Sequence, residues 1–417
     1  MPRNQREEVN FRFTENNVEY SFSDVFVPSD IFVEGDLWAW GSQDSGSLGN
    51  NVALSFVGQR SIPITLPLVA GKLGVSKWST VFAGSDYSAA IKTDGSLWLW
   101  GSNSGKLGNF QTNTRSTPIT TFLGGNNWSS ISLGRNHTAA IKTDGSLWLW
   151  GSTGYGQLGI NVGGTGAARS TPITTVLGGS WLSVSCGAFH TAAVRNDGTM
   201  WCWGRNNTGA LGNNKPNSVL DADNTRSTPV QTSLGGTNWS SVACGYEFTT
   251  SIKSDGSLWS WGTGTSGQLG TNDTTSRSTP VTTLLGGFIW SSVTCGSLHT
   301  VALKTDGTLW SWGSNSSGQL GVNNDNNRRT PVTTLLGGTN WKTLGRLNCE
   351  TISSVAIKTD GTLWTWGRCS DGQLGINATP IGRSTPVTTI TGGYFWKSAS
   401  IGKNHGLGIQ VATNDFI

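Results

Sequence analysis

The sequence predicts an all-β fold, a seven-bladed β-propeller in which one blade is shared between the N- and C-terminal parts of the chain. Three observations support this prediction. The motif W-x-W-G occurs seven times at intervals of 50 to 60 residues. Each interval contains patterns that are typical of strands and tight turns. The two ends of the chain each hold an incomplete copy of the repeat, as expected of a ring that closes on itself.

Tryptophan marks every repeat. Each W-x-W-G supplies two tryptophans and a third follows 30 to 40 residues after the first, which accounts for all 21 in the chain. In "LWLW" the two tryptophans alternate with other residues, so they share one face of a strand. Indole rings bury a large apolar area, and we expect them to pack the blades together. The predicted structural core consists of Trp38, Trp40, Trp98, Trp100, Trp148, Trp150, Trp201, Trp203, Trp259, Trp261, Trp310, Trp312, Trp364 and Trp366.

The second repeat shows the order of the predicted elements. Residues 127–134, "NWSSISLG", form the first strand, and residues 137–142, "HTAAIK", form the second. The "TDG" that follows predicts a hairpin turn, because Asp-Gly tolerates the positive φ angles of a type I′ turn. Residues 147–150, "LWLW", form the third strand. The fourth strand, within "STPITTVL" at 170–177, lies at the blade edge, where proline removes no ladder hydrogen bond.

The ends of the chain predict how the ring closes. Residues 37–41, "LWAWG", lack the preceding strands of a repeat, whereas the chain stops at "GLGIQVATNDFI" (406–417), where the next "LWxWG" would follow. Pairing of these segments completes one blade and removes an open strand edge. We therefore predict a propeller over residues 37–417 and an N-terminal extension over residues 1–36. The extension either lies on the propeller as an extra strand or docks on a neighbouring protein by adding to its sheet.

Composition argues against several classes of protein. Charged residues make up 12% of the chain, against about 25% in typical domains. Residues 1–36 hold three arginines and eight acidic residues, which argues against a basic arm that binds nucleic acid. No apolar run reaches the roughly 18 residues needed to cross a bilayer, and the first residues lack the apolar core of an export signal. We expect a soluble protein with no membrane insertion and no nucleic-acid partner.

The sequence contains no motif that indicates catalysis. G-x-S-x-G, H-E-x-x-H and the P-loop pattern are all absent, and we expect neither an enzyme activity nor a cofactor. The chain has six cysteines, and three of them, Cys186, Cys244 and Cys295, occupy equivalent positions of separate repeats. Equivalent positions seldom meet at bonding distance, so these cysteines are predicted to be buried free thiols.

All four histidines share one repeat position, which raises the question of a metal site. Equivalent positions on adjacent blades lie about 10 Å apart, the spacing of packed sheets. Side chains that far apart cannot bind one metal ion together. We therefore predict no metal site and assign a structural, hydrogen-bonded role to His137, His190, His299 and His405.

The combination of W-x-W-G, G-x-L-G, "CGxxHT" and "KTDG" within one repeat resembles the regulator of chromosome condensation repeat family. The resemblance covers residues 37 to about 413 and implies a seven-bladed propeller closed by a split blade. Members of that family include a guanine-nucleotide exchange factor, a plant ultraviolet-B photoreceptor and a secreted β-lactamase inhibitor, so the resemblance selects no single function. The photoreceptor uses tryptophans in G-W-R-H-T motifs, whereas the matching positions here hold Ser85, Arg135, Ala188, Tyr246, Ser297 and Lys403.

Departures from the repeat point to candidate partner-binding residues, because loops on a rigid scaffold commonly carry binding sites. The segment 341–358 takes 17 residues from its tryptophan to its lysine, where other blades take 14, and therefore contains an insertion. A second long loop spans residues 213–225. The candidates are Arg346, Asn348 and Glu350 in the first segment and Asp221, Asp223 and Asn224 in the second.

The predicted function is a non-catalytic structural or protein-binding propeller whose partners are other proteins of one assembly. Its low-charge repeats, rich in Ser, Thr, Asn and Gly, are similar to those of family members from tailed phages and bacteria. This similarity suggests a virion component such as a tail, baseplate or fibre protein. The alternative is a cytoplasmic regulatory factor, such as a guanine-nucleotide exchange factor, or a binding module of an enzyme inhibitor or adhesin. The oligomeric state stays open.

Overall fold

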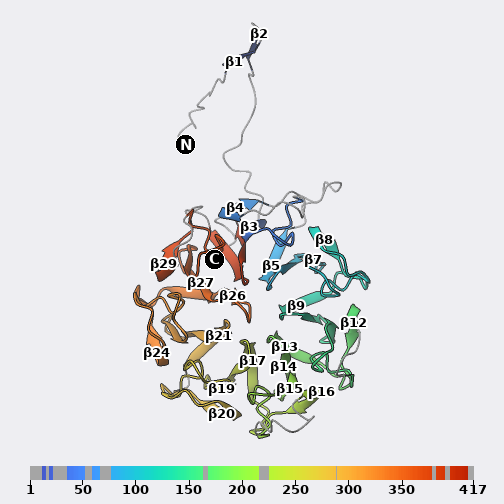
Figure 1. Ribbon diagram of the computed structural model, residues 1–417, viewed down its shortest axis with the longest axis vertical. Helices are drawn as coiled ribbons and strands as arrows, with labels where there is room; N and C mark the ends of the chain where they lie inside the picture. The colour runs from blue at the N-terminus through green and yellow to red at the C-terminus, as the bar shows by residue number, and fades with distance from the viewer. Residues whose placement is uncertain are drawn as a thin grey trace, which may run out of the picture.

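The computed structural model describes residues 12–15, 18–21, 35–51, 59–65, 77–162, 168–215, 225–287, 289–377, 382–389 and 395–411. Within these residues all regular structure is β-strand, and seven sheets surround one axis (Figure 1). The predicted seven-bladed β-propeller is therefore confirmed. In each blade the first strand lies nearest the axis and the fourth lies at the perimeter (Figure 1).

Six blades are continuous in sequence, and each contains four antiparallel strands. Blade 1 consists of β5 (Trp78–Ala83), β6 (Tyr87–Lys92), β7 (Leu97–Gly101) and β8 (Arg115–Thr120). Blade 2 consists of β9 (Trp128–Leu133), β10 (His137–Lys142), β11 (Leu147–Gly151) and β12 (Arg169–Thr174). Blade 3 consists of β13 (Trp181–Cys186), β14 (His190–Arg195), β15 (Met200–Arg205) and β16 (Thr225–Gln231).

The next three blades repeat this order, with one irregularity in blade 6. Blade 4 consists of β17 (Trp239–Cys244), β18 (Phe248–Lys253), β19 (Leu258–Gly262) and β20 (Arg277–Thr282). Blade 5 consists of β21 (Trp290–Cys295), β22 (His299–Lys304), β23 (Leu309–Gly313) and β24 (Arg328–Thr333). Blade 6 consists of β25 (Trp341–Leu344), β27 (Ser353–Lys358), β28 (Leu363–Gly367) and β29 (Arg383–Thr388). The short strand β26 (Arg346–Leu347) leaves blade 6 and joins the next sheet.

Blade 7 combines both ends of the described chain. It pairs β30 (Phe395–Ile401) and β31 (His405–Val411) with β3 (Asp36–Ser42) and β4 (Gln59–Thr65). β3 and β31 are antiparallel, with Trp38 opposite Gly408 and Trp40 opposite Gly406. The predicted split blade is therefore confirmed, and it covers the edges that each terminal part would expose alone.

The N-terminal extension contains a short hairpin. Strand β1 (Arg12–Glu15) pairs antiparallel with β2 (Val18–Ser21). Residues 22–34 of the predicted docking segment lie outside the described residues. The assignment of residues 1–36 as an extension, and its role in docking, stay predictions.

The predicted tryptophan core divides into two groups. The second tryptophan of each W-x-W-G motif is fully buried, whereas the first is half-buried. Each remaining tryptophan lies at the start of the first strand of a blade and packs against the pair in the third strand of that blade. In blade 5, the ring centroid of Trp290 lies 6.4 Å from that of Trp310 and 5.9 Å from that of Trp312. The half-buried Trp310 lies near the hairpin turn, where the amine of Lys304 lies 3.9 Å from its ring centroid. The second tryptophans thus lie inside the core clusters, whereas the first pack against these clusters and also border solvent.

A hydrogen bond from each fully buried tryptophan joins its blade to the preceding blade. The indole N–H donates to a main-chain carbonyl in the G-x-L-G turn of the neighbour, over 2.6 to 2.9 Å. The seven pairs are Trp40 to Gln373, Trp100 to Ser47, Trp150 to Lys106, Trp203 to Gln157, Trp261 to Ala210, Trp312 to Gln268 and Trp366 to Gln319.

The glycine of G-x-L-G is required by the same contact. Gly270 has a φ angle of +72°, and a Cβ placed there would lie 2.9 Å from Nε1 of Trp312. Any larger residue would therefore be strained and would push the indole away from the Gln268 carbonyl. The recurrence of W-x-W-G and G-x-L-G in one repeat follows from this single inter-blade contact.

Two variants within one strand test the role of this bond. Trp312→Phe removes the indole N–H and leaves the buried Gln268 carbonyl with one partner fewer, so we expect a loss of about 2–4 kcal/mol in the free energy of unfolding. Trp310→Phe, two residues away and half-buried, should cost about 1 kcal/mol. Urea unfolding followed by far-ultraviolet circular dichroism measures both values. Equal losses in the two variants would contradict the proposed importance of the inter-blade bond.

Candidate partner-binding face

An insertion in blade 6 distinguishes one face of the propeller. Residues 345–352, the inserted segment, lie between β25 and β27, as the longer spacing in the sequence predicts. Within this segment β26 pairs in parallel with β30 of blade 7, with Arg346 opposite Ser400. We call the face that holds this segment the insertion face, and the opposite face, which holds the T-D-G turns, the hairpin face.

Asn348 closes one end of the central channel. Its side-chain amide donates to the Leu133 carbonyl of blade 2 over 2.8 Å, and its Oδ1 accepts from the Ser85 hydroxyl of blade 1 over 3.4 Å. Its main-chain N–H donates to the Ile401 carbonyl of blade 7 over 3.0 Å. Only 3% of Asn348 is exposed. The segment therefore crosses the axis and links four blades.

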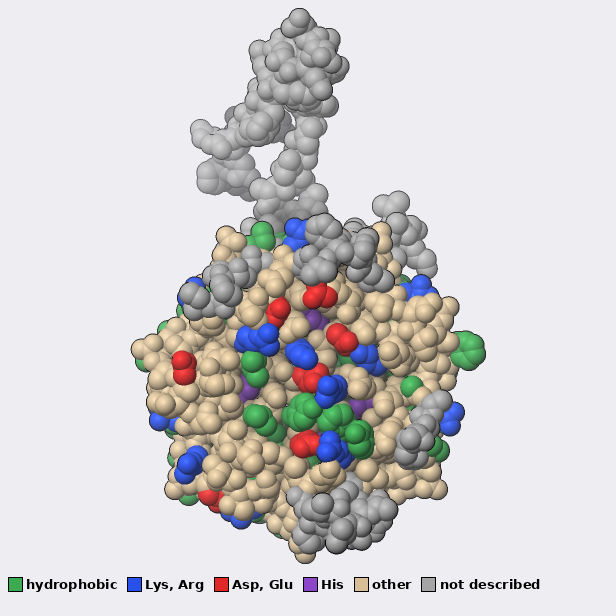
Figure 2. Space-filling view, in the orientation of Figure 1, with side chains coloured by type: hydrophobic (Ala, Val, Ile, Leu, Met, Phe, Trp, Pro, Cys, Tyr) green, Lys and Arg blue, Asp and Glu red, His purple; other side chains and the backbone are tan. Residues whose placement is uncertain are grey.

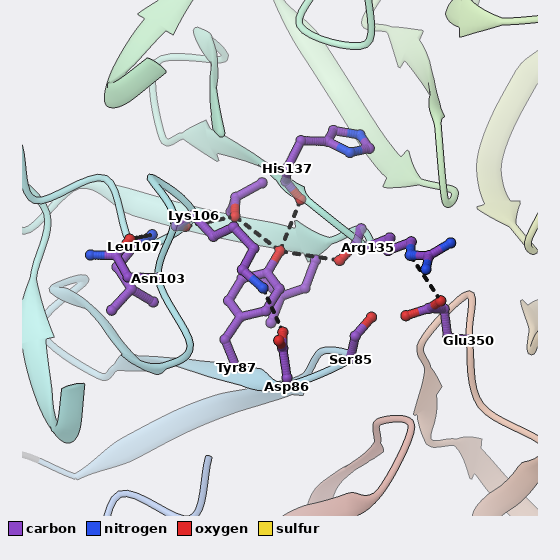
Figure 3. Close-up of polar contacts among 12 residues, drawn as sticks. Ser85, Asp86, Tyr87, Asn103, Lys106, Leu107, Arg135, His137 and Glu350 are labelled. Carbon is purple, nitrogen blue, oxygen red and sulfur yellow. Dashed lines mark hydrogen bonds and ion pairs between the residues drawn. The ribbon is translucent and has the colours of Figure 1, made fainter. Parts of the chain in front are cut away.

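Glu350 extends the inserted segment toward blades 2 and 4. Its carboxylate lies 3.3 Å from Nε of Arg135 (Figure 3). Nη1 of Arg135 in turn donates to the Tyr246 hydroxyl over 2.7 Å. The guanidinium stays partly exposed, whereas 9% of the Glu350 side chain is accessible. This network holds Arg135 over the sealed channel end.

An aromatic cluster continues from Arg135 across blades 3 and 4. Phe189 packs against Tyr155 and Tyr246, with centroid distances of 5.0 and 5.7 Å. The Arg135 guanidinium lies 5.5 Å from the Phe189 ring centroid, and Arg205 lies 5.2 Å from the same ring. Figure 2 shows charged and apolar side chains gathered around the centre of one face, while most of the perimeter is uncharged. The arginines and aromatic rings thus form one continuous surface, the arginine–aromatic cluster.

A carboxylate completes this cluster. Glu247 lies 3.2 Å from Nη1 of Arg205. Partial burial raises the pKa of Glu247, and the nearby Arg205 opposes that rise. Partial burial also raises the pKa of Tyr246, against the lowering effect of Arg135. The Tyr246 hydroxyl is therefore neutral at physiological pH and can both donate and accept a hydrogen bond.

On blade 1 the insertion face carries a third ion pair. The Lys106 amine lies 2.5 Å from the Asp86 carboxylate and 4.8 Å from the centroid of the Tyr87 ring (Figure 3). The Tyr87 hydroxyl donates to the His137 carbonyl over 2.9 Å. Only 4% of the Lys106 side chain is exposed. These contacts tie blade 1 to blade 2 and leave the Asp86 carboxylate partly accessible.

The four histidines connect adjacent blades, as the sequence predicts for structural residues. His190 Nε2 lies 3.0 Å from the Thr249 hydroxyl of the next blade, and that hydroxyl donates to the Ala210 carbonyl. Because the hydroxyl proton is used, Nε2–H of His190 is the donor. Burial lowers the pKa of His190 to about 4, so the ring is neutral at pH 7. Burial lowers the pKa of every histidine from 6.5, to about 3 for His137 and His299 and to about 4 for His190 and His405.

The predicted partner-binding residues occupy different environments. Asn348 is buried beneath the insertion face. Glu350 pairs with Arg135 and orients that side chain on the face. Arg346 points away from that face and lines a central cavity. Asp221, Asp223 and Asn224 lie outside the described residues. A role in partner binding stays a prediction for all six.

Sequence reasoning missed the arginine–aromatic cluster. Arg135 and Tyr246 stand at the photoreceptor-motif position of blades 2 and 4, and the repeat spacing does not show that their side chains meet over blade 3. Their signal is a departure from the repeat, because the same position elsewhere holds Ser, Ala or Lys. Phe189 and Tyr155 likewise stand at positions that vary between blades.

Further structural findings bear on the expected chemistry. All six cysteines are free and buried, which confirms the prediction for Cys186, Cys244 and Cys295. Among the described residues, no group of three or more histidine, cysteine or acidic side chains has the geometry to hold a metal ion. The part of the chain that the structure describes contains no helix long and apolar enough to span a membrane.

Comparison with protein families identifies the class of protein that this geometry defines. The family model described as the RCC1-like domain matches residues 31–349, and the regulator of chromosome condensation (RCC1) repeat matches residues 360–409. The chain therefore belongs to the RCC1-like family of β-propellers.

Two curated relatives come from Arabidopsis thaliana. The chain is 32% identical to the ultraviolet-B receptor UVR8 over 353 residues, which cover 82% of this chain and 76% of the receptor. It is 29% identical to the mitochondrial RCC1 domain-containing protein RUG3, with 84% and 81% covered. Both alignments span most of each protein.

Solved structures show the same fold. Yeast RCC1 (Prp20), crystallised bound to Kap60, superimposes with a TM-score of 0.77 at 18% identity and covers 92% of this chain and 90% of its own. Human WBSCR16 gives a TM-score of 0.75 at 20% identity, with 91% and 99% covered. These likenesses establish the architecture.

The buried histidines predict a loss of stability in mild acid. Their folded pKa values lie below 6.5, so the unfolded chain binds protons first as the pH falls. Stability is therefore full above pH 6.5 and is lost toward pH 4, by about 1.4 kcal/mol per pH unit for each histidine. Urea unfolding at pH 7, 6 and 5 measures this slope.

The variant His190→Tyr provides the control, because blade 1 carries Tyr87 at the same repeat position and that residue contacts the Thr138 hydroxyl over 3.1 Å. The variant should lower the slope by about 1.4 kcal/mol per pH unit, since one titrating group is gone. An unchanged slope would show that His190 is not the neutral buried group described above.

Proposed function

We propose that this chain is a non-catalytic propeller that binds another protein through its insertion face. The observation that carries the proposal is the arginine–aromatic cluster of Arg135, Phe189, Tyr246, Arg205 and Tyr155. Arginine and tyrosine are enriched among the residues that contribute most to binding at protein interfaces. The side chains are held in place by ion pairs with Glu350 and Glu247, so little conformational freedom is lost on binding.

The relatives support a protein-binding role. The yeast RCC1 (Prp20) structure contains Kap60, and a second yeast structure was described together with the binding of Prp20p to Gsp1p and histones. We carry over only the class of interaction, because these structures share 18% of their residues with this chain. Within the described residues, the insertion face offers a preformed surface for such a partner.

Among the finer predictions, a regulatory factor is better supported than a virion component. The relatives named above are plant, yeast and human proteins, and none of them points to a phage particle. The virion hypothesis, including a tail, baseplate or fibre role, rests on repeat composition alone. An inventory of purified particles decides it, because a virion protein occurs there at fixed stoichiometry. A nucleotide-release assay with candidate GTPases tests the exchange-factor alternative.

Photo-crosslinking tests the proposed face directly. Tyr155 is 38% exposed at the edge of the cluster, and Leu284 is 59% exposed beyond the end of β20 near the hairpin face. A benzophenone amino acid at position 155 should give discrete protein adducts in extracts of the source organism, identified by mass spectrometry. The same group at position 284 serves as the matched control. Equal adduct patterns at both positions, or none at position 155, would contradict the proposal.

Affinity for the identified partner gives the quantitative test. Truncation of an arginine at an interface centre costs about 2 kcal/mol or more, which corresponds to roughly a 30-fold loss of affinity. We expect this loss for Arg135→Ala, measured by calorimetry with the purified partner. Leu284→Ala should leave the affinity unchanged. The thermal stability of both variants is measured alongside, so that a folding defect is recognised.

A further inference from the structure

The axis of the propeller encloses a cavity that the protein-binding role does not use. Its volume is about 620 Å³, and the innermost strands of all seven blades line it. Leu347 and Asn348 of the inserted segment close it at the insertion face. At the other end lie the first residues of the innermost strands, including Ser79 and Ser291. The channel is therefore a blind pocket, with a volume typical of small-molecule sites, about 300–1,000 Å³.

The charged residues that line this cavity are all positively charged. Its described lining includes three cationic residues, Lys342, Arg346 and Lys397, and no aspartate or glutamate. Lys342 and Lys397 follow the third tryptophan of blades 6 and 7, the two blades joined by β26. The other blades carry uncharged residues at this position: Ser79, Ser129, Leu182, Ser240 and Ser291. The positive charge is thus a local departure from the repeat.

Arg346 packs against an aromatic ring of blade 1. Its guanidinium carbon lies 4.5 Å from the centroid of the Phe82 ring, and no acidic side chain pairs with it among the described residues. Protein surrounds the side chain, although part of it remains accessible to solvent within the cavity. This enclosure lowers the pKa of Arg346. A cation held in such a place without a carboxylate creates a strong field for an anion.

Hydroxyl groups supply neutral donors around the same cavity. Ser132, Ser185 and Thr294 each accept a main-chain N–H from the next blade, over 2.9, 2.9 and 3.1 Å. These bonds fix the oxygen atoms at the blade boundaries. The Ser132 and Ser185 hydroxyls also contact the thiols of Cys186 and Cys244. Sulfur is a weak acceptor, so a bound oxyanion would compete successfully for these hydroxyl protons.

We propose that this cavity binds a small oxyanion, a phosphate- or carboxylate-bearing metabolite, which Arg346 and Lys397 contact by charge and the ring of serine and threonine hydroxyls by hydrogen bonds. A planar guanidinium pairs with two oxygens of either group, and hydroxyl donors complete the remaining acceptor positions. The site is separate from the arginine–aromatic cluster and does not depend on the protein-binding proposal.

Ligand-induced stabilisation provides the test. Inorganic phosphate and citrate are titrated at constant ionic strength against sodium chloride, and the melting temperature of the full chain is recorded. A ligand that binds only the folded state raises the melting temperature in proportion to its occupancy. We expect a saturable rise for at least one of the two anions, and the tighter of them identifies the preferred group. A response no greater than that of chloride would overturn the proposal.

Three variants locate the site. Arg346→Met and Lys397→Met should each weaken the apparent affinity at least tenfold, because each removes a charge from the cavity. Lys403→Met removes the same charge from the loop between β30 and β31, at the other end of those strands, and should bind like the wild type. Lys397 is exposed at the cavity mouth, so its variant decides the question if Arg346→Met does not fold. Wild-type affinity in Lys397→Met and in a folded Arg346→Met would overturn the proposal.

Discussion

The bond between a buried indole and the carbonyl of the preceding blade is the constraint on which the rest of this structure depends. A four-stranded blade cannot bury its faces alone, so it is stable only between two neighbours. At every boundary the second tryptophan of W-x-W-G donates to the G-x-L-G turn of the blade before it, and Trp40 makes this bond to Gln373 across the split blade. An unmade bond there would leave a buried polar group unpaired, at a cost of about 1–3 kcal/mol.

The same inter-blade bond recurs at all seven boundaries, so the blades differ mainly in the segments outside these contacts. The innermost strands surround the axis, and there the inserted segment of blade 6 departs from the repeat. Because β26 pairs with β30, Asn348 seals one channel end, while Glu350 positions Arg135 on the outer surface. One departure thus produces both a blind cavity and an ordered surface cluster. The two proposed binding sites lie on opposite sides of the same eight-residue segment, 345–352.

Most of the fold could be predicted from the sequence, because the spacing of tryptophan and glycine reports a contact that recurs in each repeat. The spacing also revealed the insertion near Arg346. It could not reveal that the first tryptophans, such as Trp310, border solvent, since alternation places both on one strand face. Nor could it bring Arg135, Phe189 and Tyr246 together, because these residues come from three consecutive blades, and their contact depends on how those blades curve around the ring and not on local pattern.

Hydrogen exchange at the indole N–H groups measures the central claim most directly. NMR spectra of the protein labelled with 15N at tryptophan resolve the side-chain signals, and their decay in D2O gives an opening free energy for each. The seven second tryptophans should exchange only by global unfolding, with one common opening free energy, whereas the half-buried first tryptophans should exchange much faster. Exchange of the second tryptophans at widely different rates from blade to blade, or as fast as the first, would contradict a ring held by equivalent inter-blade bonds.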